Sequence, residues 1–453
     1  MFYLEKSTPL TPELLYKMIN KFRVEVEPQL QVYKNYYDGK QKVLERSYSD
    51  TTKPCNKSLI NYCKNIVDSY CGYLATPGYI SYTTEEVIMD VLKYNDYQAQ
   101  DADYLLSALI HGVACELMYI DEESKTRFRL INPLECFGVY DDSLTNDLLY
   151  FVRMYKQNNW DDSNTYCVDV YGEQLIQHYT MGGKQGQLTF ISDEPHYFSQ
   201  CPANIFYLPD EKSIFDCIMT LQDSSNEILS TEIDDYQAFC DAYLTLTGDF
   251  DVESFQEELP NMKENRVLIL PNGAVASWLT KNASDTQVEN ILKRLHDAIY
   301  RIAACPDFSS ESFIGGVSSG IAIRYRLTGM ETRAGKVAAE MKKALQRRVE
   351  IICGIASLKL GEEVFREVDI DFKRNIPTDN AEIVNLVNSL KGTVSEETLL
   401  GMLPFVDDVT EELTKVEEQK KRNMEVYNFG NLNFDETEED EEDETDSTDS
   451  NQL

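Results

Sequence analysis

A helix, a glycine- and serine-rich loop and a much longer helix follow one another between residues 285 and 360, and this arrangement constrains the fold most strongly. In DTQVENILKRLHDAIYRIAA, residues 285–304, apolar side chains recur at three- and four-residue steps, which predicts an amphipathic helix. Pro306 lacks the amide hydrogen that a continuing helix needs, so we expect the helix to end before it. The next segment, DFSSESFIGGVSSG at 307–320, holds three glycines, five serines and no positive charge, which predicts a loop.

Residues 321–360 are predicted to form one long helix. One face of it would carry apolar residues at helical spacing: Ile323, Leu327, Met330, Ala334, Val337, Met341, Leu345, Val349 and Ile352. A helix of about 40 residues, with a rise of about 1.5 Å each, extends for roughly 60 Å. Gly329 and Gly335 are weak points at which it could bend.

The rest of the chain alternates between helical and strand-like regions. Helical periodicity predicts helices within 11–46, 53–80, 84–119 and 211–241. Short runs rich in β-branched and aromatic residues between 113 and 208 predict antiparallel strands. Residues 242–280 indicate a small strand–loop–strand insert between two long helices, and a strand and further helices follow Gly361. The predicted fold class is α+β and mostly helical.

Several protein classes are not favoured by the composition. We find no run of eighteen apolar residues that would predict a transmembrane helix, and no secretory signal pattern in MFYLEKSTPLTPELL. The eleven cysteines form no C-x-x-C pair, so we expect reduced and mostly buried thiols. The four histidines are not spaced as metal ligands, so we expect neither a metal site nor a cofactor.

The chain is strongly acidic, with a formal net charge of −36. Eleven acidic residues lie between Asp435 and Asp449, and removing their charges leaves −25 for the remainder. Residues 430–453 are therefore predicted to be a disordered acidic tail. A surface of this charge is unfavourable for wrapping DNA, because phosphate neutralisation requires Lys and Arg. Two interpretations of the negative charge are open: a surface that must not bind DNA tightly, or a contribution to solubility alone.

Residues 315–320, Gly-Gly-Val-Ser-Ser-Gly, precede a helix and could cradle a phosphate. They lack the Lys-Ser/Thr of a phosphate loop and the spacing of a dinucleotide fingerprint. No Ser-His-Asp, Cys-His or paired-carboxylate set has a defensible spacing. These residues leave a dispersed catalytic site open. The alternative hypothesis for the chain is a phosphate- or nucleotide-binding enzyme that uses the loop 315–320.

The long helix 321–360 contains the main basic segment of this acidic chain. Its cations are Arg324, Arg326, Arg333, Lys336, Lys342, Lys343, Arg347 and Arg348, against the acids Glu331, Glu340 and Glu350. Two interpretations are open for this segment. It forms ion pairs with acidic neighbouring subunits, which we favour, or it contacts DNA.

Several short stretches, in order and spacing, resemble the portal (head–tail connector) proteins of tailed bacteriophages. The main one is PDFSSESFIGGVSSGIAIRYRL at 306–327. The others are Tyr37-x-Gly39-Lys40-Gln41, Asn132-Pro133 with Val139-Tyr140-Asp141, Asp223 with Asn226 and Ser230, Phe372-x-Arg374-Asn375-x-Pro377, and Gly392-x-Val394-Ser395-x-x-Thr398-Leu399. The resemblance covers most of residues 30–425.

The resemblance implies a portal-type organisation. The implied regions are a wing at 1–210, a first stem helix at 211–241, a clip at 242–284, a second stem helix at 285–305, a tunnel loop at 306–320, a long helix with a return to the wing at 321–390, and crown helices at 391–429. The tunnel loop would face DNA through Ser309, Ser310, Ser312, Phe313, Gly315, Gly316, Ser318, Ser319 and Gly320. The basic tunnel or interface residues would be Arg324, Arg326, Arg333 and Lys336.

The resemblance also implies that the chain is a structural protein and not an enzyme, and it implies a set of partners. About twelve copies would form a ring at one capsid vertex, and double-stranded DNA would pass through it during packaging and ejection. The expected partners are the large terminase subunit, the head–tail adaptor, and capsid and scaffold proteins, with no membrane partner. The expected location is the virion, and the host cytoplasm during assembly.

Overall fold

The structure, a computed structural model, describes residues 2–50, 53–156, 165–183, 186–240, 243–247, 273, 275–279, 285–310, 320–361, 363–364, 367–374, 380–403, 406 and 409–431. The chain divides into two compact units. The larger comprises Met1–Val317 and Ile323–Ile376, and the smaller comprises Ser318–Ala322 and Pro377–Leu453. Within the described residues, no helix is both long enough and apolar enough to cross a membrane.

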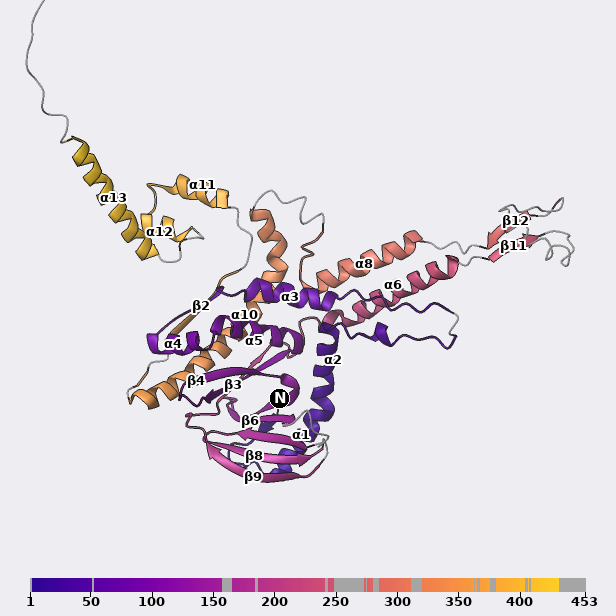
Figure 1. Cartoon of the computed structure of the whole chain (residues 1–453), viewed down its shortest axis with the longest axis horizontal. Helices are drawn as coiled ribbons and strands as arrows, with labels where there is room; N and C mark the ends of the chain where they lie inside the picture. Colours follow the sequence, from indigo (N-terminus) through magenta and orange to yellow (C-terminus); the bar gives the residue numbers. More distant parts are fainter. Residues whose placement is uncertain are drawn as a thin grey trace, which may run out of the picture. The chain divides into compact units, whose positions relative to one another are not determined.

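Most helices belong to the larger unit (Figure 1). They are α1 (Pro12–Lys21), α2 (Glu27–Tyr37), α3 (Tyr62–Leu74), α4 (Glu86–Tyr94), α5 (Tyr97–His111), α6 (Met219–Cys240), α8 (Asp285–Ala303) and α10 (Gly320–Leu360), of which the first three residues belong to the smaller unit. The Thr11 side chain caps α1 by accepting from Leu14 N at 3.3 Å, and Pro12 occupies the first turn, where a missing amide hydrogen costs nothing.

The strands of the larger unit form four sheets. The six-stranded sheet has the order β1-β5-β6-β7-β8-β9, with β1 (Phe2–Leu4), β5 (Cys136–Asp141), β6 (Leu148–Lys156), β7 (Thr165–Tyr171), β8 (Leu175–Gly182) and β9 (Leu188–Pro195). The three-stranded sheet has the order β10-β3-β4, with β10 (Ala203–Tyr207), β3 (Val113–Ile120) and β4 (Thr126–Ile131). Two pairs complete the set: β2 (Ile80–Thr84) with β13 (Val368–Phe372), and β11 (Tyr243–Thr247) with β12 (Val275–Leu279).

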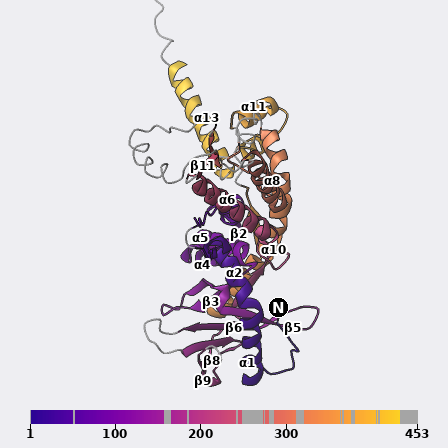
Figure 2. The ribbon, with the colours of Figure 1, turned by 90° about the vertical axis from the view of Figure 1, so that its right-hand side faces the viewer.

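The predicted α+β class with antiparallel strands is confirmed. The pair of β1 with β5 is parallel, and the other strand pairs described are antiparallel. Figure 2 shows β6, β8 and β9 stacked below α2 and β3 in that view.

Helix α10 carries much of the core of the larger unit. Its apolar face is buried as its periodicity predicts, at Leu327, Met330, Ala334, Val337, Met341, Leu345, Val349 and Ile352. The helix assignment is continuous through Gly329 and Gly335, the two positions at which the sequence permits a bend. A glycine in a helix interior costs roughly 1 kcal/mol relative to alanine.

The helix predicted to begin at residue 211 begins later. Helix α6 starts at Met219, after a 3-10 turn at Asp216–Ile218. Ser213 explains the delay, because its hydroxyl donates to Leu109 O at 3.1 Å and accepts from Phe215 N at 3.4 Å. These bonds hold residues 213–215 in a turn, which competes with helix formation.

Helices α6 and α8 lie side by side, and the β11–β12 pair joins the chain between them (Figure 1). Strands β11 and β12 form an antiparallel pair at the two ends of the predicted strand–loop–strand insert. Within 242–284, the described residues are these strands and Gly273.

The smaller unit is helical. It contains α11 (Asn380–Leu390), α12 (Glu396–Gly401) and α13 (Val409–Asn431). Ser395 caps α12 by accepting from Thr398 N at 3.3 Å, and Lys420 of α13 lies 3.3 Å from Glu396. The predicted tail beyond residue 431 lies outside the described residues.

Candidate functional site

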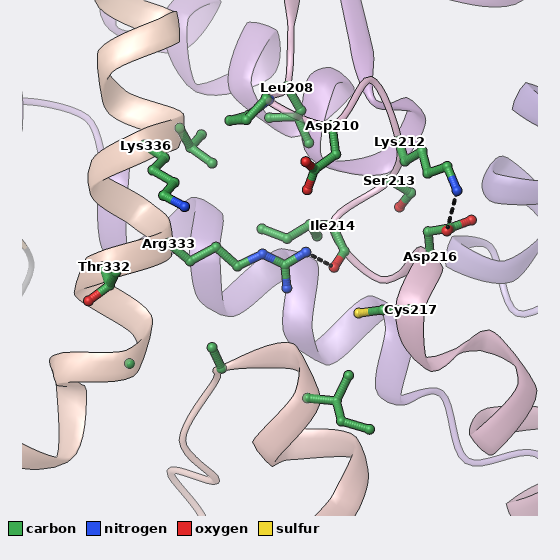
Figure 3. Close-up of a pocket in the computed structure, with 15 residues that line it drawn as sticks. Leu208, Asp210, Lys212, Ser213, Ile214, Asp216, Cys217, Thr332, Arg333 and Lys336 are labelled. Atoms are coloured by element: carbon green, nitrogen blue, oxygen red, sulfur yellow. Dashed lines mark hydrogen bonds and ion pairs between the residues drawn. The ribbon is translucent and has the colours of Figure 1, made fainter.

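The candidate site surrounds the first half of α10, where the predicted basic residues and the predicted loop meet. Arg333 joins three elements there. Its guanidinium donates to Ala303 O at the end of α8 (3.1 Å) and to Ile214 O before α6 (2.7 Å). Figure 3 shows the bond to Ile214. The last carbonyls of a helix lack partners within the helix, and a cation there is favourable.

Tyr70 of α3 reinforces this junction. Its hydroxyl lies 3.0 Å from Ala303 O and 3.1 Å from Ala304 O. Burial raises the pKa of the Tyr70 phenol, so the hydroxyl stays protonated and acts as a donor. Ala304 adopts a left-handed backbone with φ of 52°, which ends α8. Arg333 and Tyr70 therefore fix the end of α8 against α3 and α10.

A pocket of about 460 Å³ opens beside Arg333 (Figure 3). Its charged lining residues are Asp210, Lys212, Asp216, Arg333 and Lys336. Lys212 lies 3.4 Å from Asp216, whereas Lys336 has no hydrogen-bond or ion-pair partner among the residues that the structure describes. In Figure 3 the Lys336 and Asp210 side chains point toward the pocket.

The pocket holds opposite charges and lacks a catalytic pairing. Cys217 lines it, but no histidine does. The lining residues therefore lack the cysteine–histidine pair that activates many nucleophilic cysteines. Across the described residues, no group of three or more His, Cys, Asp or Glu side chains could hold a metal ion. The charged lining of this pocket suits ion pairs with another group, and Lys336 is the residue able to form one.

Ser309 and Ser310, predicted to face DNA, fold back onto Asp307. Ser309 Oγ donates to Asp307 Oδ1 at 2.6 Å, and Ser310 Oγ donates to Asp307 O at 2.9 Å. His296 Nε2 of α8 lies 3.5 Å from Asp307 Oδ2. These contacts form a tight turn directly after Pro306. The structure thus describes the beginning of the predicted loop as an ordered turn held by α8.

Of the other predicted loop residues, the structure describes only Gly320. Ser312, Phe313, Gly315, Gly316, Ser318 and Ser319 lie outside the described residues, and Gly320 is the first residue of α10. Arg324 and Arg326 are exposed one turn later. Arg326 lines a second pocket with His296 and Asp307. Arg324 has no partner among the described residues.

The basic segment of α10 is less available than its composition indicates. Arg348, one of the eight cations counted in it, is fully buried and forms an ion pair with Asp101 of α5. It also donates from Nε and Nη2 to Glu116 of β3, at 2.8 and 2.6 Å. Neither of the two interpretations of this segment holds for Arg348, because its charge is neutralised inside the subunit. Lys342 likewise lies 3.1 Å from Asp369 of β13.

A second polar region was not anticipated from the sequence. Helix α6 buries a stripe of polar side chains at four-residue spacing: Gln222, Asn226, Ser230 and Asp234. They bind the main chain of residues 56–62, which run alongside. We call these four side chains the α6 polar ladder.

Successive side chains of the α6 polar ladder contact alternate residues of the neighbouring segment 56–62, one residue each. The side-chain oxygens of Gln222, Asn226 and Ser230 accept from the backbone N of Tyr62, Ile60 and Ser58, each at 3.0 Å. Asp234 Oδ1 accepts from Asn56 N at 2.6 Å. Four helical residues rise about 6.0 Å. Two extended residues span about 6.6 Å. The two repeats therefore match.

The ladder brings together motifs that are far apart in the sequence. Asn226 Nδ2 donates to Gln41 Oε1 at 2.8 Å, and the Tyr36 hydroxyl donates to Asp223 at 2.7 Å. Arg46 donates to Asp234 Oδ2 at 2.7 Å. The four-residue spacing of polar residues in α6 is the signal that predicts a buried polar face, but nothing in the spacing identifies its partner.

Other polar groups singled out in the sequence have structural roles. Asp121 accepts from the backbone N of Glu123 (3.0 Å) and Lys125 (2.8 Å), which makes it a turn residue. His111 is buried at the end of α5, with Nδ1 3.0 Å from Ser107 O. The ten described cysteines are free thiols, and six of them are buried. Burial raises the pKa of the Cys305 thiol to about 12, so it remains protonated.

Comparison with known proteins identifies what the chain resembles. The family model "Phage portal protein, SPP1 Gp6-like" matches residues 23–426. The chain is similar to the portal protein of Bacillus phage SPP1, at 24% identity over 94% of this chain and 87% of that protein. Among solved structures it is similar to a chain of the "Neck of empty GTA particle computed with C6 symmetry", at 12% identity and a TM-score of 0.40, over 75% of this chain and 88% of that one. The structural likeness is too loose to identify a shared fold.

Proposed function

Because this chain belongs to the SPP1 Gp6-like phage portal protein family, we propose that about twelve copies of it form the closed ring through which DNA enters and leaves the capsid. Membership of the family means a structural protein of the virion, in a ring at a capsid vertex, and not an enzyme. The match over residues 23–426 is the observation that supports this conclusion. The enzyme hypothesis for the loop 315–320 gains no support from the relatives.

A ring of identical subunits requires a heterologous interface, in which two different surfaces of each copy meet. The charges around α10 provide two surfaces of different charge, one basic and one acidic. Lys336 and Arg324 have no partner among the described residues, whereas the chain as a whole has 78 acidic and 42 basic residues. Ion pairs from this part of α10 to an acidic neighbouring subunit therefore remain our favoured interpretation of these two residues.

The region assignments are part of the proposal. Helices α6 and α8, side by side and joined through β11 and β12, are consistent with a stem at 211–241 and 285–305 and a clip at 242–284. The wing is assigned to residues 1–210 with the return to about 390, and the crown to 391–429. Terminase and the head–tail adaptor would dock at the clip, while capsid and scaffold proteins would contact the rest of the ring. Assembly would take place in the host cytoplasm.

Residues 306–320 are proposed as the tunnel loop, which meets DNA on the ring axis. Support comes from the two ends of the loop. Asp307 and its serine contacts hold the start, and α10, anchored by Arg333, holds the end. The acidic remainder of the protein would repel phosphates, so DNA would slide rather than bind.

A substitution in the loop tests the channel function. Replacing Gly315-Gly316 by Pro-Pro restricts the backbone there, since proline fixes φ and glycine does not. We expect reduced packaging or retention of DNA per procapsid, with ring assembly and melting temperature nearly unchanged. The matched control places Pro-Pro at Ser447-Thr448, in the acidic tail outside the family match. Full packaging with normal retention would refute the tunnel-loop assignment.

A further inference from the structure

A cavity of about 780 Å³ lies between the three-stranded and six-stranded sheets. We call it the inter-sheet cavity. Strands β3, β4, β6, β7 and β8 contribute to its walls, and residues 194–198 with Pro202 complete them. Leu117, Ile131 and Tyr171 provide a buried apolar wall. The cavity is separate from the Arg333 pocket and has no role in the function proposed above.

Two arginines line the inter-sheet cavity without a carboxylate partner. Arg153 stacks on the Tyr155 ring at 4.3 Å, and its Nε is buried without a hydrogen-bond acceptor. Neither arginine forms an ion pair among the residues that the structure describes, although Arg129 is exposed and Arg153 shares a side-chain hydrogen bond with Tyr171. A buried donor without an acceptor costs about 1–3 kcal/mol, so such groups call for a ligand.

The opening of the cavity carries exposed aromatic side chains. Tyr197 is 66% exposed and Tyr119 is 42% exposed. Tyr197 has φ of 61°, in the left-handed region that residues other than glycine seldom adopt. Strained residues of this kind concentrate at binding sites, where the surroundings hold them in place. The strain and the exposed rings both point to a contact made at this opening.

At neutral pH the cavity lining is net positive. Burial lowers the pKa of His196, whose Nε2 lies 3.0 Å from Gly172 O, so the ring is neutral. Glu194 is the single acidic lining residue, and its carboxylate lies 3.6 Å from His178 Nε2 of β8. The charges of Arg129 and Arg153 therefore dominate the lining.

We propose that the inter-sheet cavity binds an acidic side chain from an extended segment of a partner protein, with Arg129 and Arg153 as its carboxylate contacts and Tyr119 and Tyr197 as its apolar contacts. Arginine suits this role because its planar guanidinium matches a carboxylate. A protein segment is favoured over nucleic acid, since a strongly acidic protein repels a polyanion but accepts a single carboxylate. The apolar wall also suits peptide side chains.

The test measures binding of an acetylated peptide, Val-Glu-Tyr-Glu-Val, to the full-length protein by calorimetry. The same peptide with Gln in place of both Glu is the ligand control. We expect Arg129→Gln and Arg153→Met each to weaken binding by about tenfold or more, as expected for loss of a charge-assisted hydrogen bond. Lys17→Gln, at an exposed position of α1, should leave binding unchanged.

A further variant separates binding from folding. Tyr197→Gly should weaken peptide binding while keeping or raising the melting temperature, because glycine relieves the strained backbone. Equal binding of the Glu and Gln peptides, absence of binding by the Glu peptide, or indifference to both arginine substitutions would overturn the proposal. Binding of a short DNA duplex that is lost in the same two arginine variants would also overturn it, in favour of a phosphate ligand.

Discussion

At the scale of single residues, the most consequential side chain is Arg348. It is fully buried and contacts Asp101 and Glu116, while its guanidinium lies 4.5 Å from the Phe128 ring centroid. Its position in the sequence contains a clue to this burial. Arg348 follows Leu345 by three residues and precedes Ile352 by four, so it lies within the apolar face of α10. Its partners belong to elements more than 200 residues away, and no local pattern identifies them.

Removing Arg348 should strongly destabilise the larger unit. Arg348→Met leaves two buried carboxylates without their cation, and breaking a buried pair costs about 3–5 kcal/mol. The control is Lys343→Met, because Lys343 forms an exposed pair with Glu340, which is worth at most about 1 kcal/mol. Chemical denaturation of both variants measures the difference. A similar small loss for both would show that Arg348 is not a central contact of the core.

Asp234 should make the packing of residues 53–61 sensitive to acid. Burial alone would raise the pKa of Asp234, but hydrogen bonds from Asn56 and the charge of Arg46 outweigh it, so the pKa lies below its ordinary value of 3.8. A carboxyl with a lowered pKa in the folded state stabilises that state above its unfolded pKa. This stabilisation is lost as the pH falls through the folded-state pKa.

The check is the free energy of unfolding of the wild type and Asp234→Asn between pH 2 and 7. The wild type should be more stable above about pH 4, and the difference should shrink at lower pH. A difference that stays constant over the whole range would contradict the assigned role of the charge.

At the scale of elements, the helices with apolar periodicity are predictable and those with polar contacts are less so. The apolar face of α10 and the existence of α8 follow directly from the spacing of their residues. Helix α6 begins eight residues later than predicted, because the Ser213 turn competes with helix formation. The buried face of α6 is polar, so a search for apolar periodicity misses the side that packs. Only the three-dimensional contact with residues 56–62 identifies it.

The junction of α8, α3 and α10 depends on Arg333. Arg333→Ala removes donors from the carbonyls of Ala303 and Ile214, and we expect a loss of about 1–3 kcal/mol. Arg324→Ala is the matched control on the same helix. Arg324 is exposed and has no partner among the described residues, so its substitution should change stability by less than about 0.5 kcal/mol. Equal melting temperatures for the two variants would contradict this role of Arg333.

At the scale of the whole molecule, the sequence identifies the family better than it identifies the contacts. The portal resemblance rests on short motifs, and the family match over residues 23–426 confirms it. Two of these motifs are joined by one hydrogen bond: Gln41, from the motif at 37–41, accepts from Asn226, from the motif at 223–230. The predicted basic residues of α10 fall into two groups in the structure. Arg333 is used within the subunit, while Arg324 and Lys336 keep unpaired charges in the described part of the chain.

The central claim is that copies of this chain close into a ring with a channel. Electron microscopy of the purified full-length protein, combined with mass measurement of the same sample, tests it most directly. The expected result is a closed ring of about twelve copies with an open centre. Monomers alone, or open filaments at high protein concentration, would contradict the account.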